Sequence, residues 1–197
     1  MPRLNPADGS QLESLQPLLE MVKGVMGFVP NSFLAMARKP AILQAFAGLA
    51  MQVLSAPDAE VEPELKQLIA HMASSAAGCK YCMAHTAHSA AKSGSTERID
   101  HLIEFATNGL FSEGERAALT LARDAAQVPN AVTDESFAQL NAFYSQNQIA
   151  EIVAVISLFG FLNRWNDTLA TELEQSPLAF AEEHLGPNGW TVGKHKP

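Results

Sequence analysis

The chain has 197 residues, of which 47% are hydrophobic and 17% charged, and its formal net charge is -8. This length and composition indicate one globular domain with its own core and exclude a globally disordered chain. A chain this acidic offers no basic face to nucleic acid or to an anionic membrane surface, so neither is expected as a partner.

The chain is predicted to be all-α, because no segment alternates polar and β-branched residues as a half-buried strand does. We expect a single domain with an N-terminal arm and helices in 1–57, a core in 58–175 and a C-terminal arm in 176–197. Pro40, the capping box of Ser112 and Glu115, and Thr133 mark helix starts. The expected helices cover about residues 40–54, 60–77, 79–94, 112–127, 133–144, 148–174 and 176–186.

The helix over 148–174 is expected to be apolar on nearly every side in its first half. Such a helix is surrounded by protein, at the domain centre or in a subunit interface, so we expect at least a dimer. Its longest apolar run, Ile152–Leu162, has 11 residues, fewer than the roughly 20 that cross a bilayer. No membrane span is expected. The N-terminus lacks the apolar stretch of a signal peptide, so the cytoplasm is the expected compartment.

The most informative segment holds the two cysteines of the chain, Cys79 and Cys82. Gly78 is expected to end one helix, which places both sulfurs in the first turn of the next. The helix dipole there should lower a cysteine pKa toward neutrality, and the spacing needs only a small adjustment to form a disulfide. In a reducing cytosol such a pair is redox-active, catalytic or metal-binding rather than a structural cross-link.

Two histidines follow the pair on the same helix. His85 is one turn after Cys82 on the same face, where an imidazole can accept the thiol proton or stabilise the thiolate. His88 is one turn further on and about 120° away around the helix, which makes it a less direct partner. Two alternatives remain open, a zinc site that uses both histidines and a pair of inert core cysteines. Four metal ligands on one short helix rarely wrap a tetrahedral ion, so no metal is expected.

A second polar cluster ends the long apolar helix. A weak internal similarity aligns Asn163 and Asn166 with Cys79 and Cys82. If the repeat is real, these amides face the thiols and form part of a substrate pocket. If the similarity is chance, they form a solvated or capping end of the helix.

At these residues the sequence resembles the alkylhydroperoxidase D (AhpD) and carboxymuconolactone decarboxylase family. The resemblance extends over about residues 58–175. Its cues are Cys79, Tyr81 and Cys82, the following His85-Thr86, Gly94, and the segments Glu115–Leu119, Glu151–Val153 and Phe161–Asp167. It implies an AhpD-like helical bundle around the CxxC helix, which assembles into dimers or larger rings.

The resemblance also implies a reaction. In such enzymes the second cysteine attacks a peroxide and the first resolves the sulfenic acid, which assigns attack to Cys82 and resolution to Cys79. Family peroxidases place a glutamate where this chain has Gln67 and a histidine where it has Thr86. Gln67 cannot take up a proton, so a weak activity is expected.

The nearest acid on the helix of Gln67 is Glu64, one turn earlier, and Glu151 and His71 are the alternative groups for the proton relay. The expected function is a thiol-dependent peroxidase acting on hydrogen peroxide or organic hydroperoxides, with an external dithiol as reductant. The alternatives are a decarboxylase-like lyase and a redox-responsive oligomer without turnover. No GxGxxG or P-loop pattern is present, so no nucleotide or flavin cofactor is expected.

Overall fold

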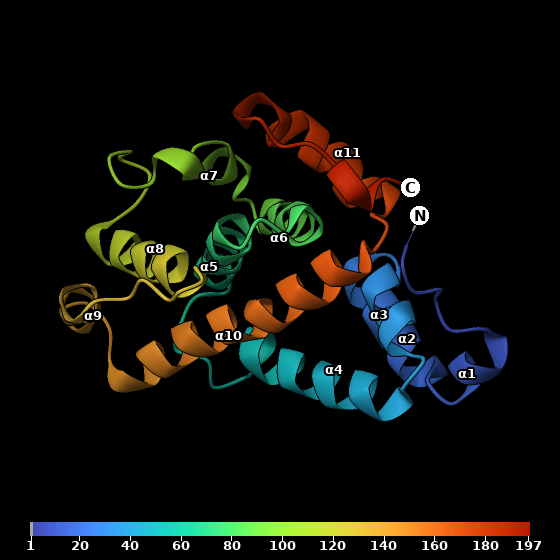
Figure 1. The fold of residues 1–197 in the computed structure, drawn as a ribbon. Helices are drawn as coiled ribbons and strands as arrows, with labels where there is room; N and C mark the ends of the chain where they lie inside the picture. The colour runs from blue at the N-terminus through green and yellow to red at the C-terminus, as the bar shows by residue number, and fades with distance from the viewer. Residues whose placement is uncertain (1) are drawn as a thin grey trace.

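A computed structural model describes residues 2–197, and within that range the chain is 68% helical with no strand (Figure 1). The prediction of an all-α fold is therefore confirmed. The N-terminal part consists of α1 (Gly9–Glu13), α2 (Gln16–Met26), α3 (Asn31–Met36) and α4 (Pro40–Ser55). The middle of the chain forms α5 (Pro63–Ala76), α6 (Lys80–Lys92), α7 (Thr96–Asp100), the 3₁₀ turn η1 (Leu102–Glu104), α8 (Glu113–Ala125) and α9 (Asp134–Asn141).

The C-terminal part begins with the longest helix of the described residues. It consists of α10 (Gln146–Leu169), α11 (Gln175–His184) and the 3₁₀ turns η2 (Gly186–Asn188) and η3 (Gly193–His195). In Figure 1, α10 runs diagonally in front of α5, with α4 on one side of it. Helix α11 packs on α6, so the C-terminal arm covers the helix that carries the cysteines.

The predicted helix starts are confirmed by their capping bonds. The Ser112 hydroxyl accepts the backbone N–H of Glu115, and the Glu115 carboxylate accepts that of Ser112. Thr133 caps α9 through its side chain in the same way. Each bond satisfies an N–H group that the first turn of a helix leaves without a partner, so the side chain fixes where the helix begins.

The centre of the fold is α5, which packs against α6, α8 and α10. Nine of its 14 residues are buried, including Lys66 and His71. The long helix α10 leaves one side open instead, with Val153 39% exposed and Phe161 42% exposed. Within one chain, the expectation that α10 is surrounded on all sides is therefore not met.

Helix α10 also ends earlier than predicted, at Leu169 rather than near Glu174. Ala170 adopts a left-handed conformation with φ 50°, and its N–H donates to the carbonyl of Asn166. A non-glycine residue rarely adopts this conformation, which is why the sequence gives little warning of it. The chain then leaves the helix axis, and Glu174 is carried to α6.

By length and composition alone, α10 is long and apolar enough to cross a membrane, and no other helix in residues 2–197 is. The helix passes this test because it continues beyond the 11-residue apolar run Ile152–Leu162. Core helices pass the same test, and 39% of the apolar window is buried inside this fold.

Candidate active site

The two cysteines lie at the start of α6, as the sequence predicts. Gly78 has φ +74°, a left-handed conformation that suits glycine, and the new helix begins directly after it. Cys79 is the N-cap residue, and its Sγ accepts the backbone N–H of Cys82 at 3.4 Å. Both cysteines are free and buried, and the pair is 3.2 Å apart. A disulfide bond length is about 2.05 Å, so a small movement closes the pair.

The environment of Cys82 differs from the expectation of an acidic thiol. Burial raises the pKa of the Cys82 thiol well above its usual value, and the hydrogen bond to Cys79 raises it further. The side-chain amide of Asn166 acts in the opposite direction, since its Nδ2 donates to Cys82 Sγ at 3.6 Å. The helix start alone therefore does not make Cys82 a thiolate, and its proton must be removed by a base or as the substrate arrives.

His85 does lie one turn after Cys82, but its hydrogen-bond partner is a carboxylate that no local sequence pattern indicates. His85 Nε2 is 2.6 Å from Glu174 Oε2, and its ring stacks on Tyr81 with centroids 4.3 Å apart. The Tyr81 hydroxyl donates to Glu174 Oε1 at 3.0 Å and accepts the backbone N–H of Ser32 at 3.3 Å. Tyr81, His85 and Glu174 thus form one hydrogen-bonded group beside the dithiol turn.

Glu174 is held as a carboxylate in this group. Burial raises its pKa, but the hydrogen bond and positive charge of His85 and the backbone N–H of Asn31 outweigh burial and bring the pKa below its usual value. The side chains of His85 and Glu174 are each 12% exposed. The negative charge of Glu174 thus lies against the imidazole of His85, in a pair that can exchange a proton one turn of α6 after Cys82.

The polar end of α10 faces the thiols, as one of the two sequence interpretations expected. Asn166 contacts Cys82, and Asn163 lies one turn earlier on the same helix. Both side chains are buried, with 1% and 3% exposed. The internal repeat has no structural counterpart, however. Residues 151–166 lie in one continuous helix, whereas Gly78 interrupts the helices before Cys79.

The carboxylates Glu151 and Glu64, considered for the proton relay, pair with basic residues away from the cysteines. Glu151 Oε2 pairs with Lys66 Nζ at 2.7 Å, near the opposite end of α10 from Asn166. At a rise of about 1.5 Å per residue, this places Glu151 roughly 22 Å along the helix from Asn166. Glu64 pairs with Arg98 at 2.7 Å. Gln67 is partly buried on α5, and no hydrogen bond in residues 2–197 joins its side chain to the cysteines.

His88 and His71 have different surroundings. His88 is partly buried between the rings of Phe28 and Phe180, where burial and the charges of neighbours lower its pKa. His71 on α5 reaches the cysteine helix, with Nδ1 3.0 Å from Thr86 Oγ1 and 3.1 Å from the carbonyl of Met83. In residues 2–197 no group of three or more His, Cys, Asp or Glu side chains is placed to hold a metal ion.

Known proteins resemble this chain in sequence and in structure. Residues 40–124 match the carboxymuconolactone decarboxylase family. Two crystal structures of the debrominase Bmp8 match over most of their length. One is the C82A variant in complex with 2,3,4-tribromopyrrole, with 34% identity, 91% of this chain and 96% of the other covered, and a TM-score of 0.84. The other is the apo protein, with 35% identity, 90% and 95% covered, and a TM-score of 0.83.

More distant matches show the fold alone. The AhpD core structure of a peroxidase-related protein from Ralstonia eutropha JMP134 has 22% identity, covers 91% of this chain and 95% of the other, and has a TM-score of 0.75. The uncharacterized protein YnjA of Escherichia coli (strain K12) is 26% identical over 110 residues. That match covers 55% of this chain and 60% of YnjA, so it spans less than two thirds of the relative's length.

The family model covers the cysteine helix, and a relative with 34% identity covers nearly the whole chain. The fold is that of AhpD-like proteins. This chain is a member of the carboxymuconolactone decarboxylase family.

Proposed function

We propose that the chain is a dithiol oxidoreductase that reduces hydrogen peroxide or an organic hydroperoxide with Cys79 and Cys82. The observation that carries the proposal is the pair of free sulfurs 3.2 Å apart at a helix start. The pair of His85 and Glu174 one turn further along α6 supports it, because thiol chemistry needs a group that moves protons.

In the proposed cycle Cys82 gives up its proton and attacks the O–O bond. The thiolate and the hydroperoxide, with one proton, yield the Cys82 sulfenic acid and an alcohol, or water when the substrate is hydrogen peroxide. The Cys79 thiol then condenses with the sulfenic acid, which forms the disulfide and releases water. An external dithiol returns both cysteines to thiols and becomes a disulfide itself.

The side chains around the pair have proposed roles. Protonated His85 supplies the proton that the leaving alkoxide takes up. Glu174 and Tyr81 hold the imidazole in place, so they are positioning residues. The Nδ2 group of Asn166 donates to Cys82 Sγ, an interaction that stabilises the thiolate once it forms.

A second candidate function is reductive dehalogenation, and the similarity to the debrominase Bmp8 favours it. There the Cys82 thiolate would attack the halogen of a haloaromatic compound, and a proton would replace the halogen on carbon. Attack of Cys79 on the sulfenyl halide would form the same disulfide and release halide. Both candidates use the same dithiol and differ in the bond that breaks.

One experiment separates these reactions. Reduced protein is mixed with hydrogen peroxide, cumene hydroperoxide or 2,3,4-tribromopyrrole, and the thiols are followed by stopped-flow fluorescence and mass spectrometry. We expect loss of two hydrogens per chain with the hydroperoxides, and turnover when a dithiol reductant is added. Disulfide formation and bromide release with tribromopyrrole alone would select the dehalogenase.

The same measurement can reject both reactions. An unchanged dithiol with every oxidant would leave the lyase alternative. A disulfide that forms once and changes the oligomeric state without turnover would identify a redox-responsive assembly. The proposed cycle needs an external dithiol and a reducing compartment, so we propose the cytoplasm as its location. We also propose that the working form of the chain is a homo-oligomer.

A further inference from the structure

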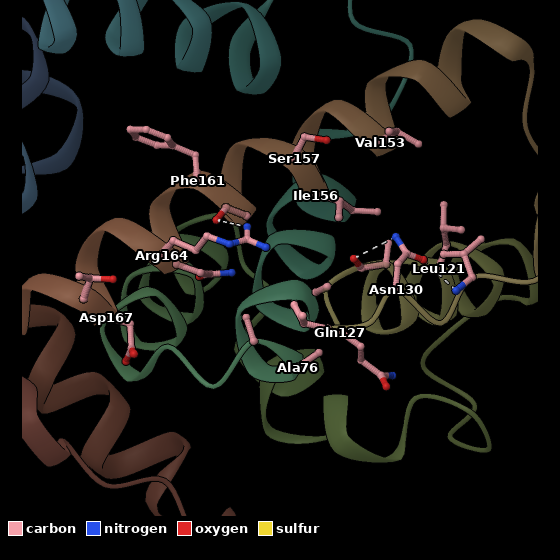
Figure 2. A pocket seen from close by; sticks show the side chains of 18 of the residues that line it. Ala76, Leu121, Gln127, Asn130, Val153, Ile156, Ser157, Phe161, Arg164 and Asp167 are labelled. Carbon is pink, nitrogen blue, oxygen red and sulfur yellow. Dashed lines mark hydrogen bonds between the residues drawn. The ribbon is translucent and has the colours of Figure 1, made fainter.

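Along α10, one turn before the Asn166 that contacts Cys82, lies a large open pocket that the cycle proposed above does not use. It has a volume of about 1270 Å³ and lies between α10 on one side and α8 with the following segment on the other (Figure 2). Its walls are mostly apolar, with Leu121, Val153, Ile156 and Phe161 among the labelled side chains. The volume and the apolar walls suit a ring-bearing small molecule far better than hydrogen peroxide.

The polar side of the pocket carries a group without a partner. Asn163 lines the pocket and is 3% exposed, and neither its Oδ1 nor its Nδ2 has a hydrogen-bond partner in residues 2–197. A buried amide without hydrogen-bond partners destabilises the fold, so such groups are rare unless something else binds them. The donor and the acceptor of Asn163 are both available to a ligand.

This amide connects the pocket to the cysteines. Asn166 lies one turn after Asn163, on the same face of α10. Its Nδ2 contacts Cys82 Sγ at 3.6 Å, whereas its Oδ1 has no partner in the described part of the chain. Three buried polar atoms without partners therefore lie on the two turns of helix between the pocket wall and the attacking sulfur.

The charged side chains that line the pocket favour a ligand with a negative charge. Arg164 lines it and donates to the carbonyl of Gly160 at 3.0 Å, and no carboxylate in residues 2–197 pairs with it. The acidic residue of the lining, Asp167, is already paired with Lys194 at 2.7 Å. The pocket thus offers a cation and an amide to an anion or to a hydrogen-bonding group on the ligand.

We propose that this pocket binds the substrate of the dithiol, and that the substrate is a small aromatic or heteroaromatic molecule. The ring packs against Ile156 and Phe161, a weakly acidic O–H or N–H group bonds to Asn163, and any negative charge faces Arg164. This inference rests on the proposed function and narrows its substrate class. Aryl hydroperoxides and halogenated heteroaromatics share the required chemistry, and kinetics distinguish between them.

Binding is tested with 4-fluorobenzoate, an inert ring with one negative charge, by fluorine NMR titration of the whole reduced protein. We expect saturable binding that weakens about tenfold or more in Asn163→Leu and in Arg164→Gln, as loss of a charged or buried hydrogen bond predicts. Arg123→Gln is the matched control, because Arg123 is exposed and pairs with Asp124 on α8. Equal binding by all variants would overturn the proposal.

Stability separates a ligand role of Asn163 from a structural one. Because its amide has no partner, Asn163→Leu should leave the melting temperature unchanged or raise it while binding falls. A lower melting temperature together with unchanged binding would assign the amide to the fold and overturn the proposal. Probe binding that disappears as protein concentration rises would assign the pocket to a second copy of the chain instead.

Kinetics complete the test and keep the two proposals apart. Cumene hydroperoxide or tribromopyrrole should oxidise the dithiol faster than hydrogen peroxide, and Asn163→Leu should abolish the difference. Equal rates for all oxidants in every variant would leave the dithiol cycle standing and reject the pocket as its substrate site. Probe binding that depends on Asn163, without oxidation by any reagent, would keep the pocket and reject the cycle.

Discussion

The two cysteines have different hydrogen-bond partners: Cys82 contacts a polar side chain of α10, whereas Cys79 contacts the backbone of α6. Cys82 receives a side-chain hydrogen bond from Asn166, and Cys79 accepts the N–H of the first helical turn. If Cys82 attacks, Cys82→Ser should abolish oxidation of the protein by cumene hydroperoxide. Cys79→Ser should consume one equivalent and stop at a sulfenic acid on Cys82, trapped with dimedone and located by mass spectrometry. Trapping on Cys79 in the Cys82→Ser variant would reverse the roles.

A second residue-scale prediction concerns Glu174, whose carboxylate joins Tyr81 and His85. Glu174→Gln keeps the size of the side chain but removes the negative charge beside the imidazole. The rate of thiol oxidation at neutral pH should fall by about 10²-fold, the lower end of what general acid–base help contributes. The rate is measured by stopped-flow fluorescence of the reduced protein mixed with cumene hydroperoxide.

Glu172→Gln is the control for this experiment. Glu172 lies two residues earlier in the same segment between α10 and α11, and its backbone carbonyl, rather than its side chain, accepts a hydrogen bond from Asn31. Its substitution should leave the rate unchanged. An equal loss in both variants would show that this segment acts through its fold rather than through the Glu174 charge.

At this scale the sequence predicted the residues that are close together along the chain. The spacing of Cys79, Cys82 and His85 on one helix follows from helix geometry alone. The approach of Asn166 to Cys82 was one of two open interpretations. Glu174 was missed because it reaches His85 from 89 positions along the chain. Its location depends on the left-handed Ala170, which no local pattern marks.

Among the elements, α5 and α6 are joined by a buried histidine whose charge state matters for stability. Burial lowers the pKa of His71 to about 4 from an ordinary value near 6.5. The unfolded chain therefore binds a proton between these values that the folded chain excludes, so stability is full above about pH 6.5 and falls toward pH 4. The shift corresponds to roughly 3 kcal/mol of unfolding free energy across that window.

This is measured by urea unfolding at several pH values. His71→Gln keeps a donor for the Met83 carbonyl but does not titrate, so its unfolding free energy should change less between pH 6.5 and 4.5 than that of the wild type. His101, which is 47% exposed, provides the control substitution His101→Gln. Identical slopes for wild type and His71→Gln would contradict the assignment of this pH dependence to His71.

An ion pair with a buried lysine joins α5 to α4 and α10. Lys66 of α5 is 1% exposed, donates to the carbonyl of Val53 in α4 and pairs with Glu151 of α10. Glu151→Gln leaves the lysine charge buried without its partner, which typically destabilises by about 3–5 kcal/mol. We expect a lower urea midpoint and an unchanged rate of dithiol oxidation per folded molecule. A slower rate at unchanged stability would return Glu151 to the proton relay.

The element scale also shows which boundaries a sequence can predict. Helix starts with a capping side chain, as at Ser112 and Thr133, were predicted because the signal is local. The end of α10 was not, since its residues favour a helix beyond Leu169. The central place of α5 does not follow from its own sequence, because Lys66 and His71 interrupt its apolar pattern and are buried through tertiary partners.

For the whole molecule, the covering of α6 by the C-terminal arm could not be predicted from the sequence. The indole N–H of Trp190 donates to the carbonyl of Lys80 at 3.3 Å, and the backbone N–H of Leu173 donates to the carbonyl of His195. The first contact joins residues 110 positions apart, and the second ties the C-terminal arm to the segment that follows α10. The all-α class, by contrast, follows from two local signals, the hydrophobic periodicity and the residues that begin and end helices.

The last prediction concerns assembly. Apolar side chains on α4 remain exposed in the single chain, with Ile42 44%, Leu49 55% and Met51 46% exposed. Exposed apolar side chains on one helix favour association with another copy. We expect at least a dimer by light scattering at micromolar concentration, and a shift toward monomer in Leu49→Lys, which lies outside the pocket. Ile103→Lys, at a side chain 70% exposed near η1, should leave the mass unchanged. A monodisperse species near 21.2 kDa for the wild type would rule out assembly through this face.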